Sequence, residues 1–273
     1  MDELADDPAI TRPDDDDLVR VEVTDRIAVV TLNRPDQRNA LNGALQRRIP
    51  EVIAQLEADR GVDVIILTGA DPSFCAGVDL KELGSGHRSP AHALLVLPKD
   101  ARGPLPPHTK PIIGAVNGVA VTGGLELALA CDFLIASDRA RFADTHARVG
   151  VMPGWGLTVL LPEAIGVRRA REMSTTGNYI DAQVANEWGL VNRVVDHDEL
   201  LPFCRRLAAD IVSNDQAGVR QMLDTYQRGT ATTGDQAWLI EADVSRAWAR
   251  DHLDPAAVEA RRQAIVDRGR RQV

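Results

Sequence analysis

Residues 111–136, PIIGAVNGVAVTGGLELALACDFLIA, decide the fold. The apolar segment 111–116 predicts a buried strand, and a glycine-rich turn follows it. Gly123-Gly124 opens a helix of small residues, and residues 133–136 predict the next strand. Strand, turn, helix and strand make a βαβ unit with a right-handed crossover, which predicts an α/β fold.

The flanking sequence extends the same pattern in both directions. Residues 19–24 and 27–32 predict a β-hairpin, and residues 64–68 predict another buried strand. Apolar residues recur at helical spacing over residues 41–56, where Pro50 predicts a kink or a restart. Residues 83–110 are rich in glycine, proline and histidine and are expected to form a variable lid. Beyond residue 156 one strand is expected at 190–195, and helices are expected at 162–173, 181–188, 199–212, 215–227, 235–250 and 255–267.

Composition limits the class of protein. The chain has 273 residues, which fits one main domain with an appended segment. With 44% hydrophobic but only 4% aromatic residues, its core must be built mainly from Ala, Val, Leu and Ile, as in helices packed on buried strands. Acidic residues crowd positions 1–17, which are predicted to be a disordered tail.

Charge and cysteine usage exclude several partners. The net charge of −9 argues against nucleic acid, since no phosphate neutralisation is available to an acidic chain. No apolar run is long enough to cross a membrane, and no signal peptide is visible, so a cytoplasmic protein is expected. Three cysteines without CxxC spacing predict neither disulfides nor a zinc site, and no metal is expected.

Two glycine-containing loops follow two different strands. They are SFCAGVDL, residues 73–80, and NGVAVTGGLE, residues 117–126. Glycine allows a backbone to approach a ligand closely, and helix N-termini present unpaired N–H groups. Two such loops can aim two amides at one developing oxyanion, although either loop alone reads equally as a structural turn. Neither loop matches a phosphate-binding or dinucleotide-binding fingerprint.

Short motifs stand in a fixed order along the chain. They are NRP at 33–35, NAL at 39–41, FCAGVDL at 74–80, KP at 110–111, AVNG at 115–118, GGLELA at 123–128, CD at 131–132, PG at 153–154 and TG at 176–177. This ordered set resembles the enoyl-CoA hydratase/isomerase (crotonase) superfamily from residue 19 to the C-terminus. The resemblance implies a spiral of ββα units over residues 18–199 and a helical trimerisation region over residues 200–273. It also implies a homotrimer or a homohexamer.

The resemblance also implies an acyl-CoA site. Its oxyanion hole would be the backbone N–H groups of Val78 and Gly123, and Glu126 matches the first catalytic carboxylate of the family. Coenzyme A would be part of the substrate, with no other cofactor. Trp155 stands where the family has a smaller residue, so its indole is expected either in the acyl-pocket wall or in the core. The other residues implied to border substrate or CoA are Arg38, Ala40, Ala76, Gly77, Asp79, Leu80 and Gly124.

One departure from the family bears on the reaction. Enoyl-CoA hydratases place a second glutamate twenty positions after the first, where this chain has His146. Histidine can exchange a proton near neutral pH but supplies no second fixed negative charge. Hydration by Glu126 and His146 is the leading hypothesis, with a role for Asp144 left open. Double-bond isomerisation by Glu126 alone and non-catalytic acyl-CoA binding are the alternatives.

Overall fold

The computed structural model describes residues 15–83 and 103–230, with isolated positions 232, 243, 247 and 251. The chain forms two compact units, Met1–Gln216 and Ala217–Val273. Positions 1–14 of the predicted tail and most of the expected lid lie outside the described residues, as do the helices expected at 235–250 and 255–267 apart from the isolated positions. The first unit carries every predicted site residue.

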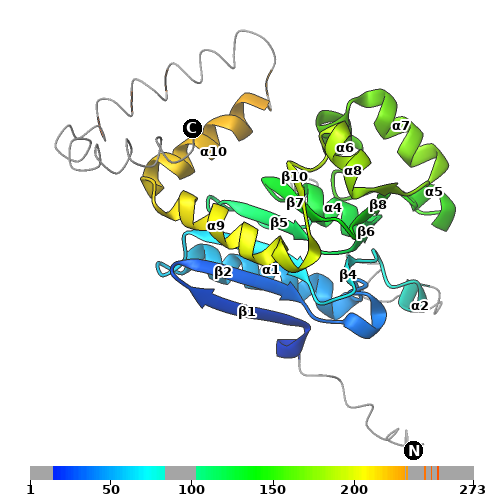
Figure 1. Ribbon diagram of the computed structural model, residues 1–273, viewed down its shortest axis with the longest axis horizontal. Coiled ribbons are helices and arrows are strands. Elements are labelled where there is room, and N and C mark those ends of the chain that lie inside the picture. The colour runs from blue at the N-terminus through cyan, green and yellow to red at the C-terminus, as the bar shows by residue number, and fades with distance from the viewer. Residues whose placement is uncertain are drawn as a thin grey trace, which may run out of the picture. The chain divides into compact units, whose positions relative to one another are not determined.

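The first unit is built on a six-stranded sheet in the order β1-β2-β3-β5-β7-β10 (Figure 1). β1 and β2 form the predicted antiparallel hairpin, and the other neighbours are parallel. The two central strands, β3 and β5, are fully buried because helices cover both faces, as their continuous apolar runs predicted. The strands are β1 Val19–Thr24, β2 Ile27–Leu32, β3 Val64–Gly69, β5 Ile112–Val116, β7 Phe133–Ser137 and β10 Arg193–Val195.

A second, four-stranded sheet was not predicted. Its order is β4-β6-β8-β9, with bounds Ser73–Cys75, Val119–Val121, Arg141–Ala143 and Ile180–Asp181. These strands have at most three residues, too short for a periodic signal in the sequence. The chain steps from β3 to β4, from β5 to β6 and from β7 to β8, entering a helix after each pair. This repeated step is the spiral of ββα units that the resemblance implied.

Helices fill the space around the two sheets. α1, Gly43–Ala58, begins at Asn42, whose side chain accepts a hydrogen bond from the Leu45 N–H at 2.9 Å. It runs through Pro50 without a break, so the expected restart is wrong. The single helix expected at 162–173 is two helices, α6 and α7, separated at Gly166 with φ 81°. The remaining helices here are α2 Leu80–Leu83, α4 Gly123–Leu129, α5 His146–Val149, α6 Leu157–Ile165, α7 Val167–Thr176 and α8 Ala182–Trp188.

Two elements lie at the expected domain boundaries. Residues 15–18 form the 3-10 turn η1, Asp15–Leu18, rather than the end of a disordered tail, because Asn33 hydrogen-bonds the carbonyl of Asp17 at 2.7 Å. At the other boundary, α9, Leu200–Val212, buries Cys204 and Ala208 against the six-stranded sheet. It therefore packs with the core sheet in the first compact unit, and the domain boundary expected at residue 199 stays a prediction.

The helix α10, Gln216–Thr230, opens the second unit. Trimerisation through the C-terminal helices stays a prediction. Within the described ranges, no helix combines the length and apolar character needed to span a bilayer.

The helix α4 packs on β4 through a glycine, and this contact generates a stability prediction. A Cβ at Gly124 would overlap the backbone carbonyl of Cys75, so α4 could pack on β4 only after a backbone shift. Gly124→Ala is expected to lower the free energy of unfolding by at least about 2 kcal/mol in chemical denaturation followed by circular dichroism. The control is Gly229→Ala in α10, where an added Cβ meets nothing within 4 Å and helix propensity improves. Equal stability of the two variants would contradict this packing.

Candidate active site

The two predicted loops contact each other through their glycine backbones. Gly77 has φ 82°, and a Cβ there would lie 2.8 Å from the carbonyl oxygen of Val121 and 3.5 Å from the Gly123 nitrogen. A Cβ at Gly123 would lie 3.7 Å from a methyl group of Val78. The loops after β4 and β6 therefore bring Val78 and Gly123 together, as the sequence indicated.

The amide of Val78 is unused. Its neighbours bond to the preceding segment: the Leu41 N–H donates to the Gly77 carbonyl at 2.8 Å, and the Asp79 N–H donates to the Leu41 carbonyl at 3.1 Å. The Val78 N–H has no partner among the described residues.

The amide of Gly123 is also unused. Gly123 is the first residue of α4, so its N–H has no intrahelical partner, and the described ranges supply none from elsewhere. Two unpaired N–H groups on contacting loops can both donate to one ligand oxygen.

Glu126 lies one turn into α4 and is only 3% exposed. Its Oε1 accepts hydrogen bonds from the backbone N–H groups of Trp155 at 2.7 Å and Leu157 at 3.4 Å. Its Oε2 lies 3.5 Å from Nε2 of His146. The loop that leads into α6 thus fixes one carboxylate oxygen, and the histidine faces the other.

His146 sits between two carboxylates at the start of α5. Its Nδ1 lies 2.6 Å from Oδ1 of Asp144, which also accepts the His146 backbone N–H at 3.1 Å. Burial lowers the pKa of His146, but hydrogen bonds and charge from Asp144 and Glu126 outweigh it and raise the pKa to about 9. Burial alone would raise the pKa of Asp144, but hydrogen bonds from His146 and Ser174 outweigh burial and lower that pKa below its usual value. At neutral pH His146 is therefore an imidazolium held by the Asp144 carboxylate.

A cavity of about 50 Å³ is lined by residues close in the sequence to Glu126 and His146, although these two are not themselves among its lining residues. Val78 and Thr122 line it, together with Thr145, which precedes the histidine. Most of the walls are apolar, so the cavity suits a small hydrocarbon group. Its other lining residues are Ala76, Leu80, Leu83, Val149 and Val151.

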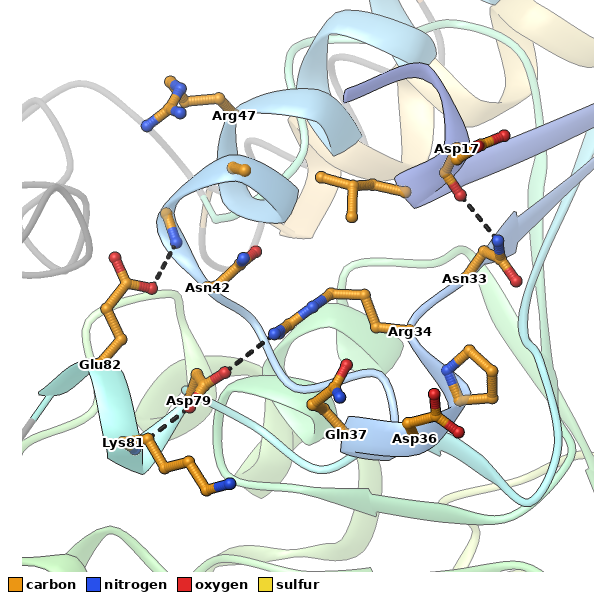
Figure 2. Close-up of a pocket in the computed structure, with 14 residues that line it drawn as sticks. Asp17, Asn33, Arg34, Asp36, Gln37, Asn42, Arg47, Asp79, Lys81 and Glu82 are labelled. Carbon is orange, nitrogen blue, oxygen red and sulfur yellow. Dashed lines mark hydrogen bonds and ion pairs between the residues drawn. The ribbon is translucent and has the colours of Figure 1, made fainter. Parts of the chain in front are cut away.

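A larger groove of about 820 Å³ has Asp79, Lys81 and Glu82 in its lining (Figure 2). Arg34 pairs with Asp79 across it at 3.1 Å, with both side chains largely buried. Arg47 and Lys81 also line it, as do Asp36 and several other acidic side chains. Sequence reasoning placed Asp79 near CoA but missed the role of Arg34 as its partner.

The segment 38–40, expected to border CoA, runs along the loop 73–80. The Ala76 N–H donates to the carbonyl of Arg38 at 3.0 Å, and the Ala40 carbonyl accepts a hydrogen bond from the Arg34 guanidinium. The Arg38 side chain itself is exposed, and Leu80 is 58% exposed. The structure therefore brings the predicted CoA-bordering backbone segments together.

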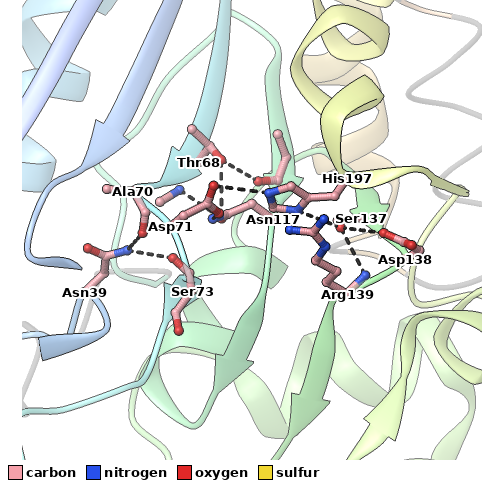
Figure 3. A network of polar contacts seen from close by, with 12 residues as sticks. Asn39, Thr68, Ala70, Asp71, Ser73, Asn117, Ser137, Asp138, Arg139 and His197 are labelled. Carbon is pink, nitrogen blue, oxygen red and sulfur yellow. Dashed lines mark hydrogen bonds and ion pairs between the residues drawn. The ribbon is translucent and has the colours of Figure 1, made fainter. Parts of the chain in front are cut away.

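Two motif asparagines hold these loops in place (Figure 3). Asn39 has φ 55°, and its side-chain amide donates to the carbonyls of Ala70 at 2.8 Å and Ser73 at 2.6 Å. Asn117 donates to Asp71 Oδ1 at 2.9 Å and accepts from the Gly69 N–H at 3.2 Å. Both asparagines hold the turn between β3 and β4, which leads into the loop 73–80.

His197 extends the network of Figure 3. It bridges Ser137 at 3.0 Å and Asp71 at 3.1 Å. Ser137 is fully buried, so this contact ties η3, His197–Glu199, to the sheet and presents no accessible nucleophile.

Trp155 and the cysteines belong to the core. Trp155 is 6% exposed and packs within the main hydrophobic cluster, while its backbone N–H reaches Glu126. A substrate contact by its indole stays a prediction. The three cysteines are free and buried, as expected, and burial raises the pKa of Cys75 to about 12, so that thiol stays protonated.

The sequence missed two residues of the site. Thr122 and Thr145 line the cavity and hydrogen-bond each other through their hydroxyl groups. The only signal was position, since each directly precedes a predicted site residue. Over the described parts of the chain, no group of three or more His, Cys, Asp or Glu side chains could hold a metal ion.

Known proteins are similar to this chain in sequence and in fold. The sequence profile of the enoyl-CoA hydratase/isomerase family matches residues 22–254. A probable peroxisomal enoyl-CoA hydratase 1 of Arabidopsis thaliana is 39% identical over 226 residues, 81% of this chain and 83% of that protein.

Solved structures agree with the sequence comparison. An enoyl-CoA hydratase from Mycobacterium tuberculosis H37Rv is 50% identical with a TM-score of 0.72, covering 84% of this chain and 98% of that one. A monofunctional enoyl-CoA isomerase from M. smegmatis is 33% identical with a TM-score of 0.67, covering 81% and 97%. The two-sheet spiral, the contacting glycine loops and the buried glutamate are thus those of a crotonase-superfamily enzyme, and the chain belongs to the enoyl-CoA hydratase/isomerase family.

Proposed function

We propose that this enzyme adds water to a 2-trans-enoyl-CoA, with Glu126 as the base and His146 as the acid. The observation that carries the proposal is the 3.5 Å contact between Glu126 Oε2 and His146 Nε2, buried close to two loops whose amides are unpaired. A carboxylate and an imidazolium at this separation can accept one proton and deliver another without solvent.

The unpaired amides would stabilise the charge that develops. The thioester oxygen of the substrate would accept hydrogen bonds from the N–H groups of Val78 and Gly123. Attack of water at the β-carbon moves an electron pair onto that oxygen and forms an enolate. Each preorganised donor in such a site contributes about 3 to 4 kcal/mol to the transition state.

Glu126 and His146 together account for every proton that moves in the reaction. Glu126 takes a proton from the attacking water, and the imidazolium of His146 gives its Nε2 proton to the α-carbon of the enolate. The proton on Glu126 then passes to the neutral Nε2 across the 3.5 Å contact. The site returns to its starting charge, and the product is a 3-hydroxyacyl-CoA.

Asp144 would act as a positioning residue. It accepts hydrogen bonds from both Nδ1 and the backbone N–H of His146. These two bonds fix the ring so that Nε2 faces Glu126, and the carboxylate favours the charged ring. The proton donor that replaces the second glutamate is therefore a histidine with its own carboxylate.

Double-bond isomerisation is the second candidate. Two backbone amides hold Oε1 of Glu126, so the carboxylate has one oriented oxygen that could move a proton between two carbons. The similarity to the M. smegmatis isomerase supports this reading. In either reaction coenzyme A is part of the substrate and no further cofactor takes part, and the homotrimer or homohexamer stays a prediction.

The base assignment predicts the behaviour of Glu126→Gln. The amide cannot accept the proton from water, so the hydration rate should fall about 10²-fold to 10⁴-fold while crotonyl-CoA binding stays within about twofold. The assay is mass spectrometry with crotonyl-CoA and a 3-enoyl-CoA in deuterated water. Glu163→Gln on the exposed side of α6 is the control and should keep full activity. Double-bond migration without water addition by the unmodified enzyme would favour the isomerase, and full activity of Glu126→Gln would exclude Glu126 as the base.

The acid assignment predicts a pH dependence. The pKa of His146 is raised to about 9, so the ring carries its proton at neutral pH and loses it only above that value. The kcat/KM for hydration should therefore stay level from about pH 7 to 8 and fall as pH rises through about 9. A profile measured from pH 6 to 10.5 on the enzyme and on His146→Gln checks this. A fall already centred near pH 6.5 would show that the imidazolium is not held as described.

Removal of the Asp144 charge should shift the decline of kcat/KM at high pH. Asp144→Asn takes away the carboxylate bonded to Nδ1, so the pKa of His146 should fall and the decline of kcat/KM should shift to lower pH. The pKa is measured directly by NMR titration of the imidazole. Asp198→Asn on η3, whose carboxylate makes no contact with His146, is the matched control. An unchanged titration in Asp144→Asn would contradict the assigned interaction.

A further inference from the structure

Thr122, the residue before Gly123, has an unusual backbone conformation. Thr122 has φ 55° and ψ −118°, a combination open to glycine but strained for a β-branched residue. Its side chain makes no capping bond to α4, and the residue is 5% exposed. Something outside its own helix must therefore hold this conformation.

Three hydrogen bonds hold it. The Thr122 N–H donates to the carbonyl of Ala143 at 3.1 Å, and its carbonyl accepts the Glu126 N–H at 3.0 Å. The third joins the hydroxyl groups of Thr122 and Thr145. The first joins the loop of Thr122 to Ala143 at the end of β8, and the third joins it to Thr145, the residue directly before His146.

Backbone geometry gives this link a consequence. A peptide unit is planar, so the ψ angle of Thr122 sets the direction of the Gly123 N–H. Thr145 occupies the N-cap position of α5, and the next residue is His146. One hydroxyl pair therefore connects the direction of an oxyanion donor with the start of the helix that carries the proton donor.

We propose that the Thr122–Thr145 hydrogen bond is a positioning device, which aims the Gly123 amide at the thioester oxygen and holds it in register with His146. This inference rests on the proposed function for the role of that amide. A threonine, rather than the unstrained glycine, stands at position 122 because only a side chain can make the link. The two residues act through the amide and the imidazole and take no part in proton transfer.

Thr145→Val and Thr145→Ser form the first matched pair. Valine keeps the shape but removes the hydroxyl, so kcat for hydration of crotonyl-CoA should fall about tenfold with KM within about twofold. Serine keeps the hydroxyl and should restore kcat to within about twofold of the unmodified enzyme. Equal kcat in all three proteins would overturn the proposal.

Thr122→Gly separates strain from function. Glycine relieves the strained backbone, so the melting temperature should rise or stay level, while kcat should fall about tenfold because the link is lost. Unchanged kcat in Thr122→Gly, whatever its melting temperature, would overturn the proposal. Thr225→Val is the control: it removes a half-buried hydroxyl in α10 that bonds the Gln221 carbonyl at 2.7 Å and should leave kcat unchanged.

A second readout does not depend on hydration. Acetoacetyl-CoA ionises to an enolate that resembles the proposed intermediate, so the absorbance of bound enolate reports how well the amide is aimed. The unmodified protein should bind it as the enolate, with about tenfold weaker binding in Thr122→Gly and Thr145→Val. If the enolate binds but crotonyl-CoA is not hydrated, the proposed reaction fails while this inference stands. Equal enolate binding by all the proteins, or none by the unmodified one, would overturn it.

Discussion

The site depends on backbone packing against backbone between two loops. At Gly77 and Gly124 the loops after β4 and β6 approach so closely that a Cβ would meet main-chain atoms of the other loop. This approach brings the amides of Val78 and Gly123 together and places Glu126 one turn further along α4. A side chain cannot substitute for these contacts, because the donors themselves are main-chain groups.

Electrostatics then decides the chemistry of the buried polar residues. A lone histidine in this position would lose its proton, since burial disfavours the charged ring. Asp144 on one side and Glu126 on the other reverse that tendency and keep the ring charged. Such a buried arrangement contributes little net stability, because the cost of desolvating the charges offsets their attraction. In the proposed hydration it would supply a proton donor whose pKa lies closer to that of a carbon acid than the pKa of an ordinary carboxyl group does.

The sequence predicted the parts of the fold that carry strong periodicity. The hairpin, the buried strands and α1 follow directly from apolar patterns, and the motif order indicated the spiral. The second sheet escaped prediction because β4, β6 and β8 have three residues each and pair only with one another and with β9. α9 looked like the start of a separate region, since the sequence cannot show that Cys204 faces the same sheet as Val29.

The site shows the same limit at the level of single residues. Glu126, Val78 and Gly123 could be nominated because each lies in a motif of known order. A role for Asp144 could only be left open and Thr145 was not considered, because the contacts of both are set by the turn between β8 and α5.

Thr122 illustrates why local preference misleads at such a position. Its backbone angles favour glycine, so a reader guided by propensity would not expect a β-branched residue there. A locally unfavourable residue persists when tertiary contacts over-determine its conformation, and such places cluster at functional sites. The strained backbone of Thr122 is therefore explained by the tertiary contact that holds this residue. Here that contact leads to Thr145, the residue beside His146, and in the proposed reaction it would join the stabilisation of the enolate to the delivery of its proton.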